Sequence, residues 1–180
     1  ATAKASTRTA AARAEEIGHR VVRADPPYPA TLINAWVRHW IAGVAVEADE
    51  LGLPIRELEP RTRTVVERGR KLIRRGHPQA GPAAAWRERA LAWFEDVDVL
   101  LTPVIARPAP PAGSATRMGY WRAYLDGARR VPFTQAWNLA GFPALTLPMG
   151  AGAGAVQLIA APGRESALLR AAADLEQHPI

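Results

Sequence analysis

The sequence has few of the side chains on which many enzymes depend. It contains no cysteine, which excludes disulfides, thiolate metal sites and cysteine nucleophiles. It has only two lysines, Lys4 and Lys71, and only three serines. No apolar run approaches the roughly 18 residues that a membrane span requires, and residues 1–16 lack the apolar segment of a secretory leader. We therefore expect a cytoplasmic protein whose chemistry uses oxygen or imidazole groups.

Serine, histidine and aspartate form no recognisable catalytic or metal site. None of the serines lies in a G-x-S-x-G motif, and only Ser114 lies in a predicted loop. The histidines are isolated from one another and lack the HxxxH or HxH spacing of zinc sites: His19, His39, His77 and His178. Asp96 and Asp98 flank a predicted strand, where helix capping explains them better than acid–base catalysis. We therefore predict no metal and no cofactor.

The net charge of +6 comes almost entirely from arginine and raises the question of a nucleic-acid partner. The arginines are spread through every predicted helix, with local groups only at residues 61–75 and 129–130. Scattered charge of this kind is typical of a solvated surface. We therefore expect no nucleic-acid partner. An affinity for nucleic acid that falls steeply as the salt concentration rises would contradict this expectation.

The order of predicted elements is typical of one α/β domain. A chain of 180 residues is long enough to bury a single core. Helical spacing of apolar residues predicts helices at 3–17, 30–51, 61–74, 83–95, 116–129 and 164–176. A further short helix is predicted at 133–139, ended by Gly141 and Pro143. Alternating or continuous apolar runs predict strands at 19–25, 97–105, 144–149 and 155–161. The run at 97–105 is typical of a buried parallel strand, and the last two strands are predicted to be buried on both faces.

Three features inside these elements carry specific expectations. Trp36 and Trp40 lie one helical turn apart and are predicted to belong to the core rather than to a ligand platform. Gly69 is predicted to weaken or bend its helix, at a cost of about 1 kcal/mol relative to alanine. The GAGAG segment at residues 150–154 leads into a strand rather than a helix, so we interpret it as a hairpin turn and not as a phosphate loop.

Three blocks of sequence resemble the C-terminal part of the amidase signature family. FTQAWNLAGFPALTLPMG followed by VQLIAAPGRESALLRAAADLE is similar to the end of these enzymes. WFEDVDVLLTPVIARPAPP resembles the family's strand ending in LLTP, and AARAEEIGHRVVRADPPYP resembles its unit of helix, glycine and strand. The blocks occur in the family's order and span essentially the whole chain. The resemblance implies an α/β/α fold around a mixed sheet, and hydrolysis of amide bonds by a serine nucleophile, a bridging serine and a lysine base.

The same resemblance implies that these three catalytic residues lie outside this sequence, in an N-terminal signature region. We therefore expect residues 1–180 to be a single domain, the C-terminal portion of an amidase, without catalytic residues of its own and inactive alone. By resemblance, the acyl pocket is lined by Thr102, Pro103, Thr134, Trp137 and Asn138. Two alternatives stay open, because Trp137 also suits a core position and Asn138 could tie loop backbone together.

The resemblance also suggests partners and two further hypotheses. The complete enzyme would bind a small-molecule amide and an N-terminal catalytic half, and faces left open by the absent half favour a homodimer. One alternative is a non-catalytic interaction domain that completes a separate N-terminal half. The other is a module similar to the A subunit of glutamyl-tRNA amidotransferase. The apolar Val131 disfavours it, because those enzymes carry an acid at this position, three residues before the equivalent of Thr134.

Overall fold

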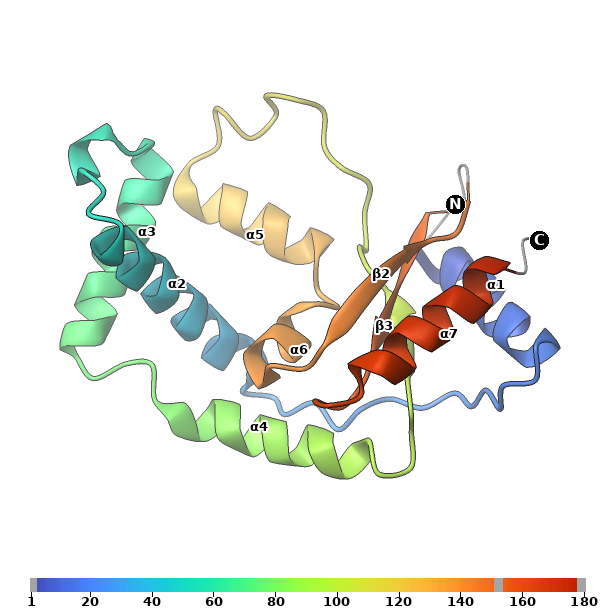
Figure 1. The fold of residues 1–180 in the computed structure, drawn as a ribbon. Helices are drawn as coiled ribbons and strands as arrows, with labels where there is room; N and C mark the ends of the chain where they lie inside the picture. The colour runs from blue at the N-terminus through green and yellow to red at the C-terminus, as the bar shows by residue number, and fades with distance from the viewer. Residues whose placement is uncertain (1–2, 151–153, 178–180) are drawn as a thin grey trace.

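The computed structural model of the chain describes residues 3–150 and 154–177. A small antiparallel sheet with strand order β1-β3-β2 lies between two groups of helices (Figure 1). In chain order the helices and strands are α1 (Ala3–Glu16), α2 (Leu32–Glu50), the 3-10 helix Ile55–Glu57, α3 (Pro60–Arg74), α4 (Ala80–Trp93), β1 (Leu100–Pro103), α5 (Tyr120–Arg130), α6 (Gln135–Ala140), β2 (Ala144–Pro148), β3 (Ala155–Ile159) and α7 (Glu165–Gln177). No helix among the described residues is both long and apolar enough to cross a membrane.

The central strand β3 divides its side chains between the two faces of the sheet. Successive side chains of a strand point to opposite faces. Val156 and Leu158 pack with α1 and α7, in a core that also contains Ala10 of α1 and Leu168 of α7. Ile159 points the other way and packs against α4 and α6. The described chain therefore has three layers, with helices on both faces of the sheet.

The core between the sheet, α4 and α6 is built mainly from aromatic side chains. Trp86 of α4 and Trp137 of α6 are fully buried, and their ring centroids lie 5.5 Å apart. Phe94 and Phe142 complete the cluster, at 5.8 and 5.7 Å from the Trp137 ring. The indole Nε1 of Trp86 donates to the Ala136 carbonyl oxygen at 2.7 Å, so its buried polar atom is satisfied.

Helices α2 and α3 pack through small residues, which corrects the prediction for Gly69. Gly69 is buried, and a Cβ built on it would lie 2.6 Å from the Ala45 Cβ and closer still to the Ile41 carbonyl oxygen. The missing side chain therefore allows the two backbones to approach closely. Helix α3 continues unbroken through this position. Gly69 is a packing residue and not a point of bending.

The two tryptophans of α2 are not the core residues that their spacing predicts. They stack on each other with ring centroids 5.9 Å apart, but Trp36 is only half-buried and Trp40 is 38% exposed. The face of α2 that packs on α3 consists mainly of alanines, including Ala45 and Ala48. Two indoles would hold the helices apart, so alanines form the contact between the helices and the tryptophans lie at the edge of that contact.

Three strand predictions also need correction. Residues 19–25 belong to no strand among the described residues, although the chain there crosses from α1 to α2 as an extended trace (Figure 1). Strand β1 pairs with β3 antiparallel and not parallel. The predicted direction was wrong because a continuous apolar run indicates burial but not the direction of the strand. Strand β2 is an edge strand in which Ala144, Thr146 and Pro148 are exposed, so it is not buried on both faces.

The predicted hairpin between the last two strands is confirmed. Strands β2 and β3 pair antiparallel, and Met149 N donates to the Gly154 carbonyl oxygen at 2.9 Å. Gly150 and Gly154 have φ values of +92° and +83°, which suit glycine. Residues 151–153, in the middle of GAGAG, lie outside the described residues.

Candidate functional site

A row of three polar side chains crosses the sheet on the face toward α4 and α6. Thr102 of β1 and Thr146 of β2 both lie directly opposite Gln157 of β3. Residues directly opposite in a sheet share a face, and these three share theirs with Leu100 and Ile159. Neighbouring strands lie about 4.8 Å apart, so the row extends over roughly 10 Å. We call Thr102, Gln157 and Thr146 the polar row.

Gln157 is the least expected member of the polar row. Its side chain is 3% exposed, yet its buried Oε1 accepts no hydrogen bond among the described residues. Burial of an unpaired polar oxygen costs about 1–3 kcal/mol. Thr146 is exposed and Thr102 is half-buried, so the polar groups beside Gln157 are open to a further partner.

Two of the predicted pocket residues lie on β1. Thr102 belongs to the polar row, and its hydroxyl donates to the Pro103 carbonyl oxygen at 3.1 Å. Pro103 is half-buried at the end of β1, opposite Val156. A proline fits this position because β1 is an edge strand.

The other three predicted residues lie on or beside α6, in different environments. Thr134 precedes α6, is half-buried, and its hydroxyl donates to the Val131 carbonyl oxygen at 3.4 Å. Trp137 is completely buried in the aromatic core. Asn138 is exposed, and its side chain makes no hydrogen bond among the described residues. The structure thus places Trp137 in the core and leaves Thr134 and Asn138 near the surface.

Tyr28 connects the aromatic core to the segment before α2. Its ring centroid lies 5.2 Å from that of Trp86 and 6.0 Å from that of Trp137. Desolvation raises the pKa of Tyr28 to about 12, Asp25 adds to the increase, and the Trp137 indole N–H partly opposes it. The Tyr28 hydroxyl therefore keeps its proton at neutral pH.

Between β1 and α6 the chain makes a long excursion, residues 104–131, that carries α5. Its base is closed by a hydrogen bond of 2.8 Å from Ala106 N to the Arg130 carbonyl oxygen. Arg130 also pairs with Asp126 at 2.8 Å, and this contact, assisted by Arg107 and Arg129, holds the pKa of the Asp126 carboxyl below its usual range. No residue of α5 is buried, so the helix lies over the body and is not inserted into it.

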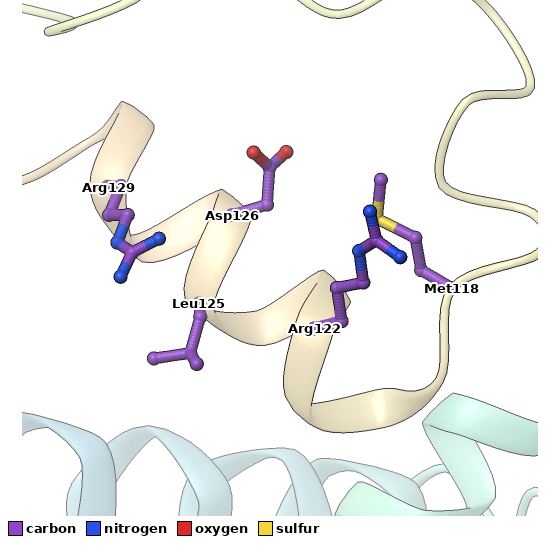
Figure 2. A pocket seen from close by; sticks show the side chains of 5 residues that line it. All are labelled: Met118, Arg122, Leu125, Asp126 and Arg129. Atoms are coloured by element: carbon purple, nitrogen blue, oxygen red, sulfur yellow. The ribbon is translucent and has the colours of Figure 1, made fainter.

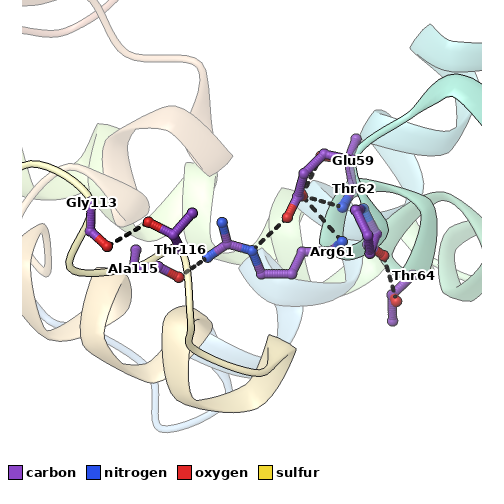
Figure 3. A network of polar contacts seen from close by, with 8 residues as sticks. Glu59, Arg61, Thr62, Thr64, Gly113, Ala115 and Thr116 are labelled. Atoms are coloured by element: carbon purple, nitrogen blue, oxygen red, sulfur yellow. Dashed lines mark hydrogen bonds and ion pairs between the residues drawn. The ribbon is translucent and has the colours of Figure 1, made fainter.

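Two arginines of α3 hold the excursion in place. Arg61 pairs with Glu59 at 2.8 Å and donates to the Ala115 carbonyl oxygen, also at 2.8 Å (Figure 3). The guanidinium of Arg68 lies 5.0 Å from the centroid of the Tyr120 ring and 4.8 Å from that of Trp121. Cation–π contacts at such exposed sites contribute about 0.5–1 kcal/mol each. The excursion is therefore attached by a few side-chain contacts.

Helix α5 borders a depression that the sequence did not predict. Its lining is mixed, with apolar and charged side chains (Figure 2): Met118, Arg122, Leu125, Asp126 and Arg129. Asp126 is paired with Arg130 and also interacts with Arg129, whereas Arg122 makes no ion pair among the described residues. This surface adds positive charge to the excursion.

Metal and self-contained catalytic sites are not found in the part of the chain that the structure describes. No group of three or more His, Asp or Glu side chains there could hold a metal ion. Lys4 and Lys71 are both exposed, on α1 and α3, and so neither lies in a water-shielded site. The described residues offer polar groups for binding, without a nucleophile and base in one place.

The sequence did contain a signal for Gln157 and Thr146. Each strand has one polar residue among apolar ones, in LLTP, ALTLP and AVQLI. A lone polar residue in a buried strand is an informative signal, because the free-energy cost of burying its polar atoms must be compensated. The register that aligns the three could not be known from the sequence.

The three-layer arrangement, with helices on both faces of a sheet that carries a polar row, is an α/β/α class of fold that many enzymes share. The family model described as Amidase matches residues 1–169. The chain belongs to the amidase family.

Individual relatives agree with this family. "Putative amidase AmiB2" of Mycobacterium tuberculosis is 34% identical over 177 residues, which are 96% of this chain and 38% of the relative. "Putative amidase AmiC" of the same organism is 32% identical over 180 residues, covering 91% of this chain and 37% of the relative. A crystal structure of an amidase superposes with a TM-score of 0.74 at 24% identity, over 97% of this chain and 41% of that one, and confirms the α/β fold. The chain thus spans about two-fifths of the length of these relatives.

Proposed function

We propose that this chain is the substrate-binding portion of an amidase that hydrolyses carboxylic amides to an acid and ammonia or an amine. The observation that carries the proposal is the amidase family match over residues 1–169 in a chain that spans only 38% of AmiB2. The serine nucleophile, bridging serine and lysine base belong to the remaining portion. Residues 1–180 act as one structural unit and are inactive alone.

Acyl-transfer chemistry explains why the isolated chain should be inactive. An unactivated serine is a weak nucleophile, and it needs a positioned base and oxyanion donors. The two lysines of the sequence are exposed on separate helices, and Ser114 lies in the excursion, half-buried and away from any strand-to-helix elbow. A binding surface without these groups does not hydrolyse an amide.

The pocket wall is formed by the predicted residues on β1 and α6 together with the polar row. Thr102 and Pro103 supply the β1 side, and Thr134 and Asn138 supply the α6 side. Trp137 contributes indirectly, because its buried ring supports α6. The hydroxyls of the polar row suit a neutral, polar ligand such as an amide, because a hydroxyl both donates and accepts.

The first experiment tests the chain alone. Purified residues 1–180 are incubated with a panel of aliphatic and aromatic amides, and ammonia or amine release is measured. The same sample is treated with a fluorophosphonate probe for active serines. We expect neither hydrolysis nor labelling. Amide hydrolysis together with labelling of Ser114 or another serine of this chain would overturn the proposal.

The second experiment restores the enzyme by mixing the chain with its catalytic portion, produced as a separate polypeptide. We expect hydrolysis only in the mixture. In that complex Thr102→Val and Thr146→Val remove hydroxyls from the polar row while keeping side-chain shape, and we expect KM to rise severalfold. Thr64→Val, on α3, is the matched control and should leave KM unchanged. Equal KM values for all three variants would show that the polar row does not line the pocket.

The remaining partner predictions belong to the same proposal. Several arginines are engaged with carboxylates, including Arg70 with Asp49 and Arg164 with Asp98, which reduces the charge available to nucleic acid. Binding to DNA or RNA is therefore expected to be absent, as a filter-binding assay at low salt would show. The exposed edge of β2 favours self-association of the isolated chain, which sedimentation would detect as a dimer.

A further inference from the structure

Helix α5 carries large apolar side chains that are exposed. None of its residues is buried, and Trp121 and Leu125 are 57% and 48% exposed. The two residues lie one helical turn apart, so their side chains are neighbours on the helix surface. Leu125 also shares the lining of the depression with Met118 (Figure 2). Trp121 and Leu125 thus form an exposed apolar surface, which we call, together with Met118, the apolar strip.

Arginines lie beside the apolar strip. Arg122 and Arg129 line the same depression as Leu125 (Figure 2). Successive residues of a helix are about 100° apart, so both arginines fall within about 100° of Trp121 and Leu125 around α5. The excursion as a whole, residues 104–131, has five arginines and one aspartate, so it carries +4 of the chain's net charge of +6. Most of the net positive charge therefore lies in the segment that carries the exposed apolar surface.

Aromatic contacts with α2 and α3 fix the orientation of α5. The ring centroid of the half-buried Tyr124 lies 6.0 Å from that of Trp40 on α2. The guanidinium of Arg68, on α3, contacts the rings of both Tyr120 and Trp121. Arg68 supports one side of the Trp121 ring, while 57% of that side chain stays exposed. A helix that is already held in place loses little entropy when its exposed side chains bind a surface.

This combination of groups fits an anionic membrane surface. Indole rings concentrate at the boundary between lipid and water, where both the apolar ring and the N–H group are accommodated. Arginine can bury its aliphatic stem beside apolar groups and keep its guanidinium among phosphates. Each basic side chain near an anionic surface strengthens binding about fivefold. A nucleic acid would use the arginines but would leave Met118 and Leu125 in water, so a membrane explains more of this surface.

We propose that α5 binds anionic membrane surfaces and lies in the plane of the headgroups. The apolar strip inserts at the boundary between headgroups and acyl chains, and Arg122 and Arg129 pair with lipid phosphates. Helix α5 has 11 residues, whereas a helix needs about 20 to cross the hydrocarbon core, so the contact is peripheral. The hydrogen bond between Ala106 and Arg130 closes the base of the excursion, so the sheet and its core need not move. This inference goes beyond the proposed function and does not depend on amide hydrolysis.

Sedimentation with lipid vesicles tests the inference on the full chain. One set of vesicles contains phosphatidylcholine alone, and the other contains phosphatidylcholine and phosphatidylserine in equal parts. We expect binding to the anionic set to be tighter by about tenfold or more, and the difference should shrink as the salt concentration rises. Brominated lipid in the anionic vesicles should quench tryptophan emission, and it should do so much less in Trp121→Phe.

Two double variants separate the contributions of the apolar strip and the arginines. Trp121→Ser combined with Leu125→Ser removes the exposed apolar surface of α5. Arg122→Gln combined with Arg129→Gln removes two positive charges and keeps polar side chains of similar length. Each double variant should weaken binding to anionic vesicles by about tenfold or more.

Helix α7 supplies the matched control. Leu169 is 60% exposed and Arg170 is also exposed, so Leu169→Ser combined with Arg170→Gln makes the same kinds of change at a distant surface. This control should bind anionic vesicles like the unchanged chain, and all the variants should have the same circular dichroism as that chain.

Several results would overturn the inference. These include equal binding to neutral and anionic vesicles, and equal affinities of the control and the two double variants. Binding to single-stranded DNA without binding to vesicles would assign the arginines to nucleic acid instead. In the complex with the catalytic portion, vesicle binding should persist, and its loss there would assign this surface of α5 to that portion. No amidase assay enters these measurements, so failure of the proposed function would leave the inference standing, and the reverse also holds.

Discussion

Replacement of Gly69 by alanine should destabilise the protein, although alanine is the better helix former. In an open helix position the change would stabilise by about 1 kcal/mol. At Gly69 the new Cβ would lie 2.6 Å from the Ala45 Cβ and closer still to the Ile41 carbonyl oxygen, and both neighbours belong to the α2 backbone or are attached directly to it. Helices α2 and α3 would have to separate by about 1 Å. Overpacking of this kind costs about 3 kcal/mol, which leaves a net loss of about 2 kcal/mol.

Urea unfolding followed by circular dichroism measures this loss. Gly43→Ala is the matched control, because Gly43 lies in α2 with nothing within 4 Å of a built Cβ. We expect Gly43→Ala to raise the free energy of unfolding by up to about 1 kcal/mol and Gly69→Ala to lower it, with similar m-values. A Gly69→Ala protein as stable as Gly43→Ala would refute close packing between α2 and α3.

Three further predictions concern single side chains. Trp86→Phe should lower the free energy of unfolding by about 2–4 kcal/mol, because it leaves a cavity and removes the buried hydrogen bond to the Ala136 carbonyl oxygen. Urea titration measures this change, and a loss below about 1 kcal/mol would contradict the buried hydrogen bond. In the unfolded chain Tyr28 loses its proton near pH 10.0, and in the folded chain near pH 12. Stability should therefore fall across that interval, and thermal melts of Tyr28→Phe should show a shallower fall. Arg164→Ala should change stability by less than about 0.5 kcal/mol, since its ion pair with Asp98 is exposed; a larger loss in the same titration would assign Arg164 another role.

The sequence predicted the positions of the helices better than their buried faces. The helical spacing at residues 30–51 located α2 within two residues at each end. The same pattern predicted that Trp36 and Trp40 lie in the core. Burial of a large apolar residue contributes the most free energy when nothing else limits the distance between helices. Gly69 of the partner helix sets that limit, and periodicity within one helix contains no information about its neighbour.

The candidate site was predictable only in part, for a similar reason. Thr102 could be named from the resemblance, but the row that contains it depends on the register of three strands, and β1 lies far before β2 and β3 in the sequence. Trp137 carried two interpretations, and its place in the aromatic core depends on Trp86, Phe94 and Phe142 from other parts of the chain. Residues 19–25 show the converse case. Their alternation predicted a strand, whereas the structure shows an extended segment that belongs to no strand among the described residues.

The closed base of the excursion has an evolutionary consequence. Residues 106 and 130 are joined by a hydrogen bond, so the chain leaves the body and returns to it at one place. Doubling the length of a loop whose ends are fixed costs only about 0.6 kcal/mol, and α5 contributes no buried residue whose loss would open the core. Insertions, deletions or wholesale exchange of this segment would therefore leave the sheet and its helices intact. Selection could change the outer surface of the protein here without first having to restabilise its interior.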